Sequence, residues 1–215
     1  MPRSPRLNAP NLFYHVFARG NNRDTIFYDD SNYQRFLANL ERYRLSLKYT
    51  LYAYCLLPNH FHILLKVDTV NLSKIMQILM TAYTMYINKK YDRVGHIFQG
   101  RFQSIIVEKE SYLLQVHRYI HLNPLKAGLV NSLQDYPWSS YTSYFTSIDG
   151  LPSLDTKGIL EMFSPDPARQ KQLLHEFTLA GLKEEFNPIK KQIRGVLGSS
   201  KFSQKLTRML KGVRP

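Results

Sequence analysis

The sequence of 215 residues has little cysteine, no long apolar run and, near its C-terminus, no acidic residue. Its single cysteine, Cys55, cannot form an internal disulfide and lies in an apolar run, so we expect a buried thiol in a reducing compartment. No apolar stretch approaches the ~20 residues that a membrane-spanning helix needs, and the N-terminal MPRSPRLNAP does not resemble a signal peptide. These absences exclude a disulfide-rich secreted scaffold and predict a soluble, cytoplasmic protein with no membrane partner.

Acidic residues are also scarce in the chain as a whole. Lysine and arginine number 29 against 16 aspartates and glutamates, which gives a formal net charge of +13 and a pI near 9.8. Such a surface attracts polyanions, and nucleic acid is the first of these to expect, which would associate the protein with the nucleoid. Because many basic proteins bind no nucleic acid, the class of function has to be decided by motifs.

The periodicity of apolar residues predicts alternating strands and helices. We expect strands over residues 12–17, 49–57, 60–67 and 102–108, with helices over 31–47 and 71–91. This order is that of an α+β ferredoxin-like fold, a split βαβ sandwich with an antiparallel sheet and both helices on one face. We expect the other face of the sheet to be open for a partner.

The rest of the chain divides by composition. A third helix over 111–122 is expected to end at Asn123, because proline at 124 disfavours helical geometry in the residue before it. We predict one domain over residues 1–145, a proline-marked linker over 146–167 and a mainly helical, basic extension over 168–215. Residues 187–215 contain eight lysines and arginines and no acidic residue. We expect their deletion to lower DNA affinity and to flatten its dependence on salt.

The most informative short motif is His60-Phe61-His62 in the third predicted strand. Side chains alternate across a strand, so His60 and His62 project to the same face about 6–7 Å apart and can grip one metal ion. Phe61 projects to the opposite face, into the core. Since an H-x-H pair by itself arises by chance more often than at a metal site, the assignment needs support from other residues.

The third predicted helix offers both a further ligand and a nucleophile. Tyr119 and Asn123 are four residues apart, so both project from one helical face. An amide oxygen from Asn123 would suit Mg²⁺ or Mn²⁺. Tyr119 would attack a scissile phosphate, which gives a phosphotyrosine and a free 3′ hydroxyl. Tyr112, seven residues earlier on the same face, is the rival nucleophile.

Four motifs together resemble one family. They are LPNHFHIL at 57–64, GHIFQGRF at 95–102, YIHLNP at 119–124 followed by Ala127-Gly128, and WSSY at 138–141. Over about residues 10–145 the chain resembles the REP-associated tyrosine transposases, which lie within the HUH single-tyrosine transposases of bacterial insertion sequences. The resemblance implies a ferredoxin-like nuclease domain that acts on single-stranded DNA near hairpins. It also implies a divalent ion held by His60, His62 and Asn123, with Tyr119 as the nucleophile.

Other polar residues are candidates for DNA contacts. Arg19, Asn21 and Arg23 follow the first predicted strand, and Arg101 ends the glycine-bounded loop, where cations can hold backbone phosphates.

Two other classes of function stay open. One is a non-catalytic protein that binds single-stranded nucleic acid, since ferredoxin-like sheets also bind RNA. The other is a metal-dependent phosphodiesterase that uses water in place of Tyr119. The oligomeric state is open between a monomer and a homodimer, because a helix after the core can swap between subunits without any change of pattern.

Overall fold

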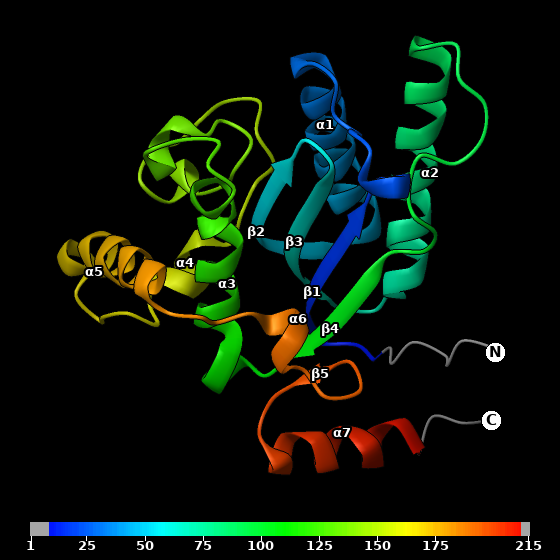
Figure 1. Ribbon diagram of the computed structural model, residues 1–215. Coiled ribbons are helices and arrows are strands. Elements are labelled where there is room, and N and C mark those ends of the chain that lie inside the picture. Colours follow the sequence, from blue (N-terminus) through cyan, green and yellow to red (C-terminus); the bar gives the residue numbers. More distant parts are fainter. Residues whose placement is uncertain (1–8, 212–215) are drawn as a thin grey trace.

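The computed structural model describes residues 9–211, and Figure 1 shows a central sheet with helices on both sides of it. The strands are β1 (Leu12–Arg19), β2 (Tyr49–Leu57), β3 (His60–Val67), β4 (Gln103–Val107) and β5 (Val196–Leu197). The helices are α1 (Asp30–Leu47), α2 (Leu72–Lys90), α3 (Lys109–Lys126), α4 (Thr156–Leu160), α5 (Pro167–Ala180), α6 (Pro188–Lys191) and α7 (Ser200–Lys211). Within residues 9–211, none of the helices has the length and hydropathy that crossing a membrane requires.

The sheet has the strand order β2-β3-β1-β4-β5. Every pairing among the first four strands is antiparallel, and β5 joins β4 in parallel. The order βαββαβ with β1 and β3 in the centre is the predicted ferredoxin-like arrangement, so the α+β fold class is confirmed. The addition of β5 was not predicted, because a two-residue strand has no periodicity to detect.

Helices α1 and α2 cover one face of the sheet. Asp29 caps α1, since its carboxylate accepts from the Asn32 amide, and the Asn71 side chain caps α2 in the same way through the amide of Ser73. The strand residues that face these helices, among them Phe61 on β3, are fully buried with the apolar stripes of α1 and α2. This face is the larger part of the hydrophobic core.

The opposite face of the sheet is also covered, so the prediction of an open face is wrong. Helix α3 lies across it, as Figure 1 shows, and buries Leu113, Val116 and Ile120 against it. On β2 the residues of this face, such as Ala53 and Cys55, are as apolar and as buried as those of the other face. A strand that is apolar on both sides must be covered on both sides, and the near-continuous apolar run over 51–57 is the signal for it.

Helix α3 continues to Lys126, so the predicted end before Pro124 is wrong. Proline has no N–H, which leaves the Ile120 carbonyl without its usual helical partner. The Asn123 side chain takes that place, because its Nδ2 donates to the carbonyls of Tyr119 at 2.7 Å and Ile120 at 3.3 Å. The helix therefore passes through the proline in the turn that follows Tyr119.

The C-terminal segment lies against the edge of the sheet. Glu108 accepts hydrogen bonds from the backbone N–H and the hydroxyl of Ser199, at 2.7 and 2.9 Å, and Leu206 of α7 is buried. Residues 146–167, predicted as a linker, contain α4, whose Ile159 is fully buried. The division into a domain, a linker and an extension stays a prediction, and its residues 1–8 and 212–215 lie outside the described part.

Candidate active site

The register of β1 and β3 places three histidines on the sheet face beneath α3. Residues directly opposite each other in an antiparallel pair share a face, and Phe17 lies opposite His62 while Arg19 lies opposite His60. His15, two residues before Phe17, is on that face too. The ring centroids of His60 and His62 are 5.1 Å apart, and those of His15 and His62 are also 5.1 Å apart. The alternation expected for His60 and His62 is therefore present, with a third histidine behind them.

Tyr119 comes to these histidines from α3. Its ring centroid lies 5.6 Å from that of His62 and 5.9 Å from that of His15, and both contacts are edge-on. Burial raises the pKa of the Tyr119 phenol above its ordinary value. A phenol in this place keeps its proton at neutral pH, so it needs a nearby positive charge to become a good nucleophile.

Tyr112, the rival nucleophile, lies two turns away on the same helix. Its ring is covered by the Lys191 ammonium, 5.6 Å from the ring centroid, and it packs at the edge of the apolar cluster under α3. The ring contact with His62 belongs to Tyr119.

His60 and His62 are both held in the uncharged form that a metal ion needs. Burial lowers the pKa of His60, and the positive charge of Arg19 lowers it further. His62 is more deeply buried, and burial, then His15 and His60, hold its pKa well below the ordinary value. The Nδ1 atom of each ring has a hydrogen-bonding partner: Asn59 Oδ1 at 2.6 Å from His60 and His15 Nε2 at 2.9 Å from His62. This donor set fits a divalent cation bound through Nε2.

Asn123, the third predicted ligand, is half-buried one helical turn beyond Tyr119. Its Nδ2 is engaged by the carbonyls of its own helix, while its Oδ1 accepts no hydrogen bond from the residues described. Within residues 9–211, no three or more histidines, cysteines, aspartates or glutamates gather as a metal-binding group. Asn123 would supply an amide oxygen instead of one of those groups.

The predicted DNA contacts lie on segments that meet beside His60. The Gly20 amide donates to the Asn59 carbonyl at 2.8 Å, and the Asn21 amide donates to the Ile97 carbonyl at 2.9 Å. These bonds join the end of β1 to the β2–β3 turn and to the glycine-bounded loop at 95–101. Three polar segments that are far apart in the sequence therefore lie side by side next to His60.

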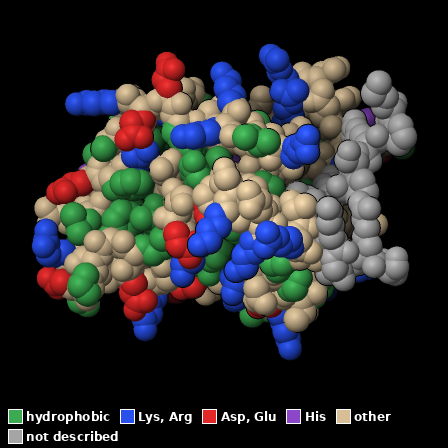
Figure 2. All heavy atoms as spheres, turned by 90° about the horizontal axis from the view of Figure 1, so that it is seen from below, with side chains coloured by type: hydrophobic (Ala, Val, Ile, Leu, Met, Phe, Trp, Pro, Cys, Tyr) green, Lys and Arg blue, Asp and Glu red, His purple; other side chains and the backbone are tan. Residues whose placement is uncertain are grey.

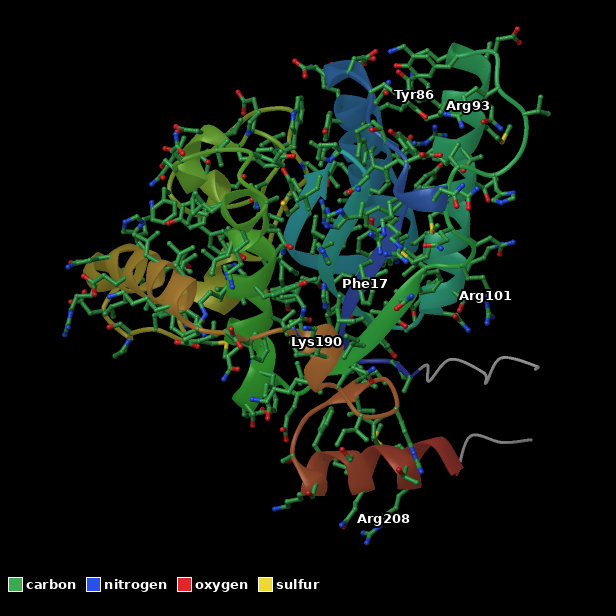
Figure 3. All side chains as sticks on the ribbon, in the orientation of Figure 1. Phe17, Tyr86, Arg93, Arg101, Lys190 and Arg208 are labelled. Carbon is green, nitrogen blue, oxygen red and sulfur yellow. The ribbon has the colours of Figure 1, made fainter. Side chains whose placement is uncertain are left out.

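The three arginines beside His60 differ in whether another side chain binds them. Arg19 donates through Nε to Gln99 Oε1 at 2.6 Å. Arg23 is exposed, and Arg101 is exposed and projects outward from the segment before β4 in Figure 3. Of the four predicted contacts, the Asn21 backbone fixes the loop, and Arg19, Arg23 and Arg101 offer charge to solvent.

Two polar residues of this site escaped sequence reasoning. His15 has no motif of its own, although it is a lone polar residue between Tyr14 and Val16 in an apolar strand. Its place beside His62 depends on the register between β1 and β3, which the sequence alone does not give. Asn59 belongs to the motif at 57–64, and its position directly before His60 is the signal in the sequence that could have found it.

Comparison with known proteins identifies the class to which this fold and site belong. The chain belongs to the IS200-like transposase family, whose sequence model matches residues 8–123. That match includes β1 to β4 and α3 as far as Asn123, and with them every residue of the candidate site. Its members are transposases, so the chain is assigned to a class of enzymes.

Particular relatives narrow this class. A curated REP-associated tyrosine transposase of Haemophilus influenzae is 28% identical over an alignment of 123 residues, in a match that covers 49% of this chain and 70% of that protein. The solved structure of a REP-associated tyrosine transposase bound to a REP hairpin superimposes with a TM-score of 0.58 at 18% identity. It covers 78% of this chain and 93% of the other. The structural match supports the fold, and together the comparisons confirm the resemblance drawn from the four motifs.

Proposed function

We propose that this chain cleaves and rejoins single-stranded DNA near hairpins, with Tyr119 as the nucleophile and Mg²⁺ or Mn²⁺ held by His60, His62 and Asn123. The observation that carries the proposal is the ring of Tyr119 lying 5.6 Å from that of His62, which joins α3 to the central strands. Membership in the IS200-like family supports the same reading.

The protein side of the metal site consists of two imidazoles and an amide oxygen. The lowered pKa values of His60 and His62 keep their rings neutral at physiological pH, and the bonds at Nδ1 leave Nε2 of each for the ion. The hydrogen bonds of Asn123 Nδ2 to its own helix hold the amide in place, with Oδ1 free to ligate. When bound, a divalent ion polarises the non-bridging oxygens of the phosphate and offsets the charge of the transition state.

Tyr119 would carry the covalent step. Its phenolic oxygen loses its proton and forms a bond to phosphorus, while the bond from phosphorus to the 3′ oxygen breaks and that oxygen becomes a hydroxyl. The product is a 5′-phosphotyrosine with a free 3′ hydroxyl. Because the phosphodiester energy is conserved in the link, a 3′ hydroxyl can attack it and rejoin the strands without ATP. This reversibility suits transposition better than degradation.

The DNA would enter along the edge that carries Arg19, Arg23 and Arg101, where cations can hold backbone phosphates. Hairpin-forming repeats are proposed as the partner because the structural relative was solved bound to a REP hairpin. The contact of Tyr119 with His62 lies within one chain, which supports cleavage in cis. A homodimer stays a prediction.

A denaturing gel separates the proposal from its two alternatives. Protein incubated with hairpin-bearing single-stranded DNA and Mg²⁺ or Mn²⁺ should give a slower band that nuclease treatment removes and that chelation prevents. A non-catalytic binder would leave the DNA whole. A phosphodiesterase that uses water would cut the DNA and leave no band of slower mobility.

A further inference from the structure

Two side chains that are neither metal ligands nor the nucleophile contact the candidate ligands at Nδ1: His15 contacts His62, and Asn59 contacts His60. We infer that His15 and Asn59 are positioning residues that accept the Nδ1 hydrogens of His62 and His60, so that both rings present Nε2 to the divalent ion. The inference rests on the proposed function only for its metal site. It does not depend on the cleavage reaction.

The nitrogen and the oxygen of the Asn59 amide face different partners. Asn59 Nδ2 donates to the Arg23 carbonyl at 3.2 Å, so the amide oxygen is the atom directed at His60. Asn59 Oδ1 lies 2.6 Å from His60 Nδ1. An amide oxygen only accepts, so His60 Nδ1 must carry the hydrogen. The lone pair of His60 is then on Nε2, and the turn between β2 and β3 selects the ligating atom.

His15 Nε2 lies 2.9 Å from His62 Nδ1, within hydrogen-bonding distance. One ring must donate and the other accept. If His15 donates, His62 carries its hydrogen on Nε2 and cannot bind a cation through that atom. If His62 donates, its Nε2 keeps the lone pair. The Nδ1 of His15 has no partner among the residues described in either arrangement, so the hydrogen bonds alone do not choose between them. A cation bound through His62 Nε2 requires the second arrangement, in which His15 Nε2 accepts from His62.

His15 is placed to act through His62 and not as a ligand itself. Its side chain is fully buried, and its ring contacts those of His62 and Phe17, with centroids 5.1 Å away in both cases. Its Nε2 is taken by His62. Partners of metal-bound histidines typically change metal affinity by about 10–100-fold when removed.

The first measurement is the tautomeric state of the wild-type protein, read by NMR of nitrogen-15 labelled histidine without metal and with Mg²⁺. His60 should carry hydrogen on Nδ1 in both states, and His62 should carry it on Nδ1 when Mg²⁺ is bound. A signal from hydrogen on Nε2 of His60 in either state, or of His62 with Mg²⁺, would overturn the assignment for that ring. This readout needs no DNA.

The second measurement compares variants that remove the acceptor with variants that keep one. Asn59→Ala and His15→Leu should weaken Mn²⁺ binding about 10–100-fold, measured by electron paramagnetic resonance titration. Asn59→Asp keeps an oxygen acceptor and His15→Gln replaces the nitrogen acceptor by an oxygen, so both variants should bind Mn²⁺ within about threefold of wild type. A merely structural role predicts losses that follow thermal stability instead, so each variant is paired with its melting temperature.

The outcomes also separate this inference from the proposed function. Wild-type affinity for Mn²⁺ in Asn59→Ala and His15→Leu would overturn the inference. Mn²⁺ binding that follows the acceptor series, in a wild-type protein that forms no covalent adduct, would refute the nuclease proposal and leave the positioning roles standing. A wild-type protein that binds no Mn²⁺ would refute the metal site, and the inference with it.

Discussion

The two faces of the sheet are built from the same strands and differ in what they bury. Beneath α1 and α2, strand residues meet aliphatic and aromatic side chains. On or beneath α3 there are four buried histidines, His15, His62, His117 and His121. Buried histidine costs stability when it must stay neutral, whereas buried phenylalanine adds stability. Both faces bury apolar side chains, and the α3 face in addition holds histidines that lower its contribution to stability in acid.

Adjacent residues on β3 give the sharpest test of this contrast. His62→Ala should lower cleavage by about 10³-fold or more, because the transition state loses charge stabilisation, and the protein should stay folded. Phe61→Leu, one residue away on the other face, should keep activity and lower the free energy of unfolding by about 1–3 kcal/mol. Cleavage assays and urea denaturation of both variants measure the contrast. Normal cleavage by both His60→Ala and His62→Ala would contradict the metal assignment.

Acid should destabilise the metal-free protein through the α3 face. Burial lowers the pKa of His15 and of His117 to about 3, while an unfolded histidine titrates near 6.5. Between these values the unfolded chain binds more protons, so stability falls as pH falls, by about 1.4 kcal/mol per pH unit for each such histidine. The window from pH 6.5 to about 4.5 lies above the pH range in which carboxylates titrate, so the loss of stability within it comes from histidines. Urea denaturation across that window measures it.

His117 is the best place to test that origin. Both of its ring nitrogens are buried without a partner among the residues described. His117→Leu should flatten the pH dependence of stability by one histidine and leave the protein at least as stable near pH 7. An unchanged slope would show that the acid sensitivity lies elsewhere.

The basic tail, residues 187–215, should contribute to the affinity for DNA and not to the chemistry of cleavage. Lys201, Lys205 and Arg208 are exposed on α7, and Arg208 points away from the sheet in Figure 3. Figure 2, viewed from the side of α7, shows lysine and arginine side chains spread over this face. Replacing these three by glutamine should reduce the salt slope of single-strand binding by about 2, since each phosphate contact contributes about 0.7.

Deletion of residues 187–215 is a poorer test of the same idea. It would remove β5 and the buried Leu206 along with the charges, so lost affinity and lost stability would be mixed. The triple glutamine variant keeps both. Binding that is equal to wild type at every salt concentration would refute a role of the tail in DNA binding.

Local pattern was enough to predict the first four strands, because alternation and helical spacing are properties of short segments. It was also enough for the shared face of His60 and His62. Local pattern did not predict the features that depend on contacts between segments far apart in the sequence. The cover over the second face depends on α3 docking, β5 depends on the free edge of β4, and the position of His15 depends on strand register. The passage of α3 through Pro124 depends on one side chain, Asn123, whose bonds no periodicity reveals.

The central claim is that Tyr119, on the side of α3 that faces the sheet, is the nucleophile. Its most direct test is to trap the covalent adduct, digest it with protease and identify the peptide that carries the nucleotide. We predict the nucleotide on Tyr119, no adduct from Tyr119→Phe, and most of the activity retained in the matched control Tyr112→Phe. A nucleotide on the peptide of Tyr112 would contradict the site assignment, and cleavage at the normal rate by Tyr119→Phe would contradict the mechanism itself.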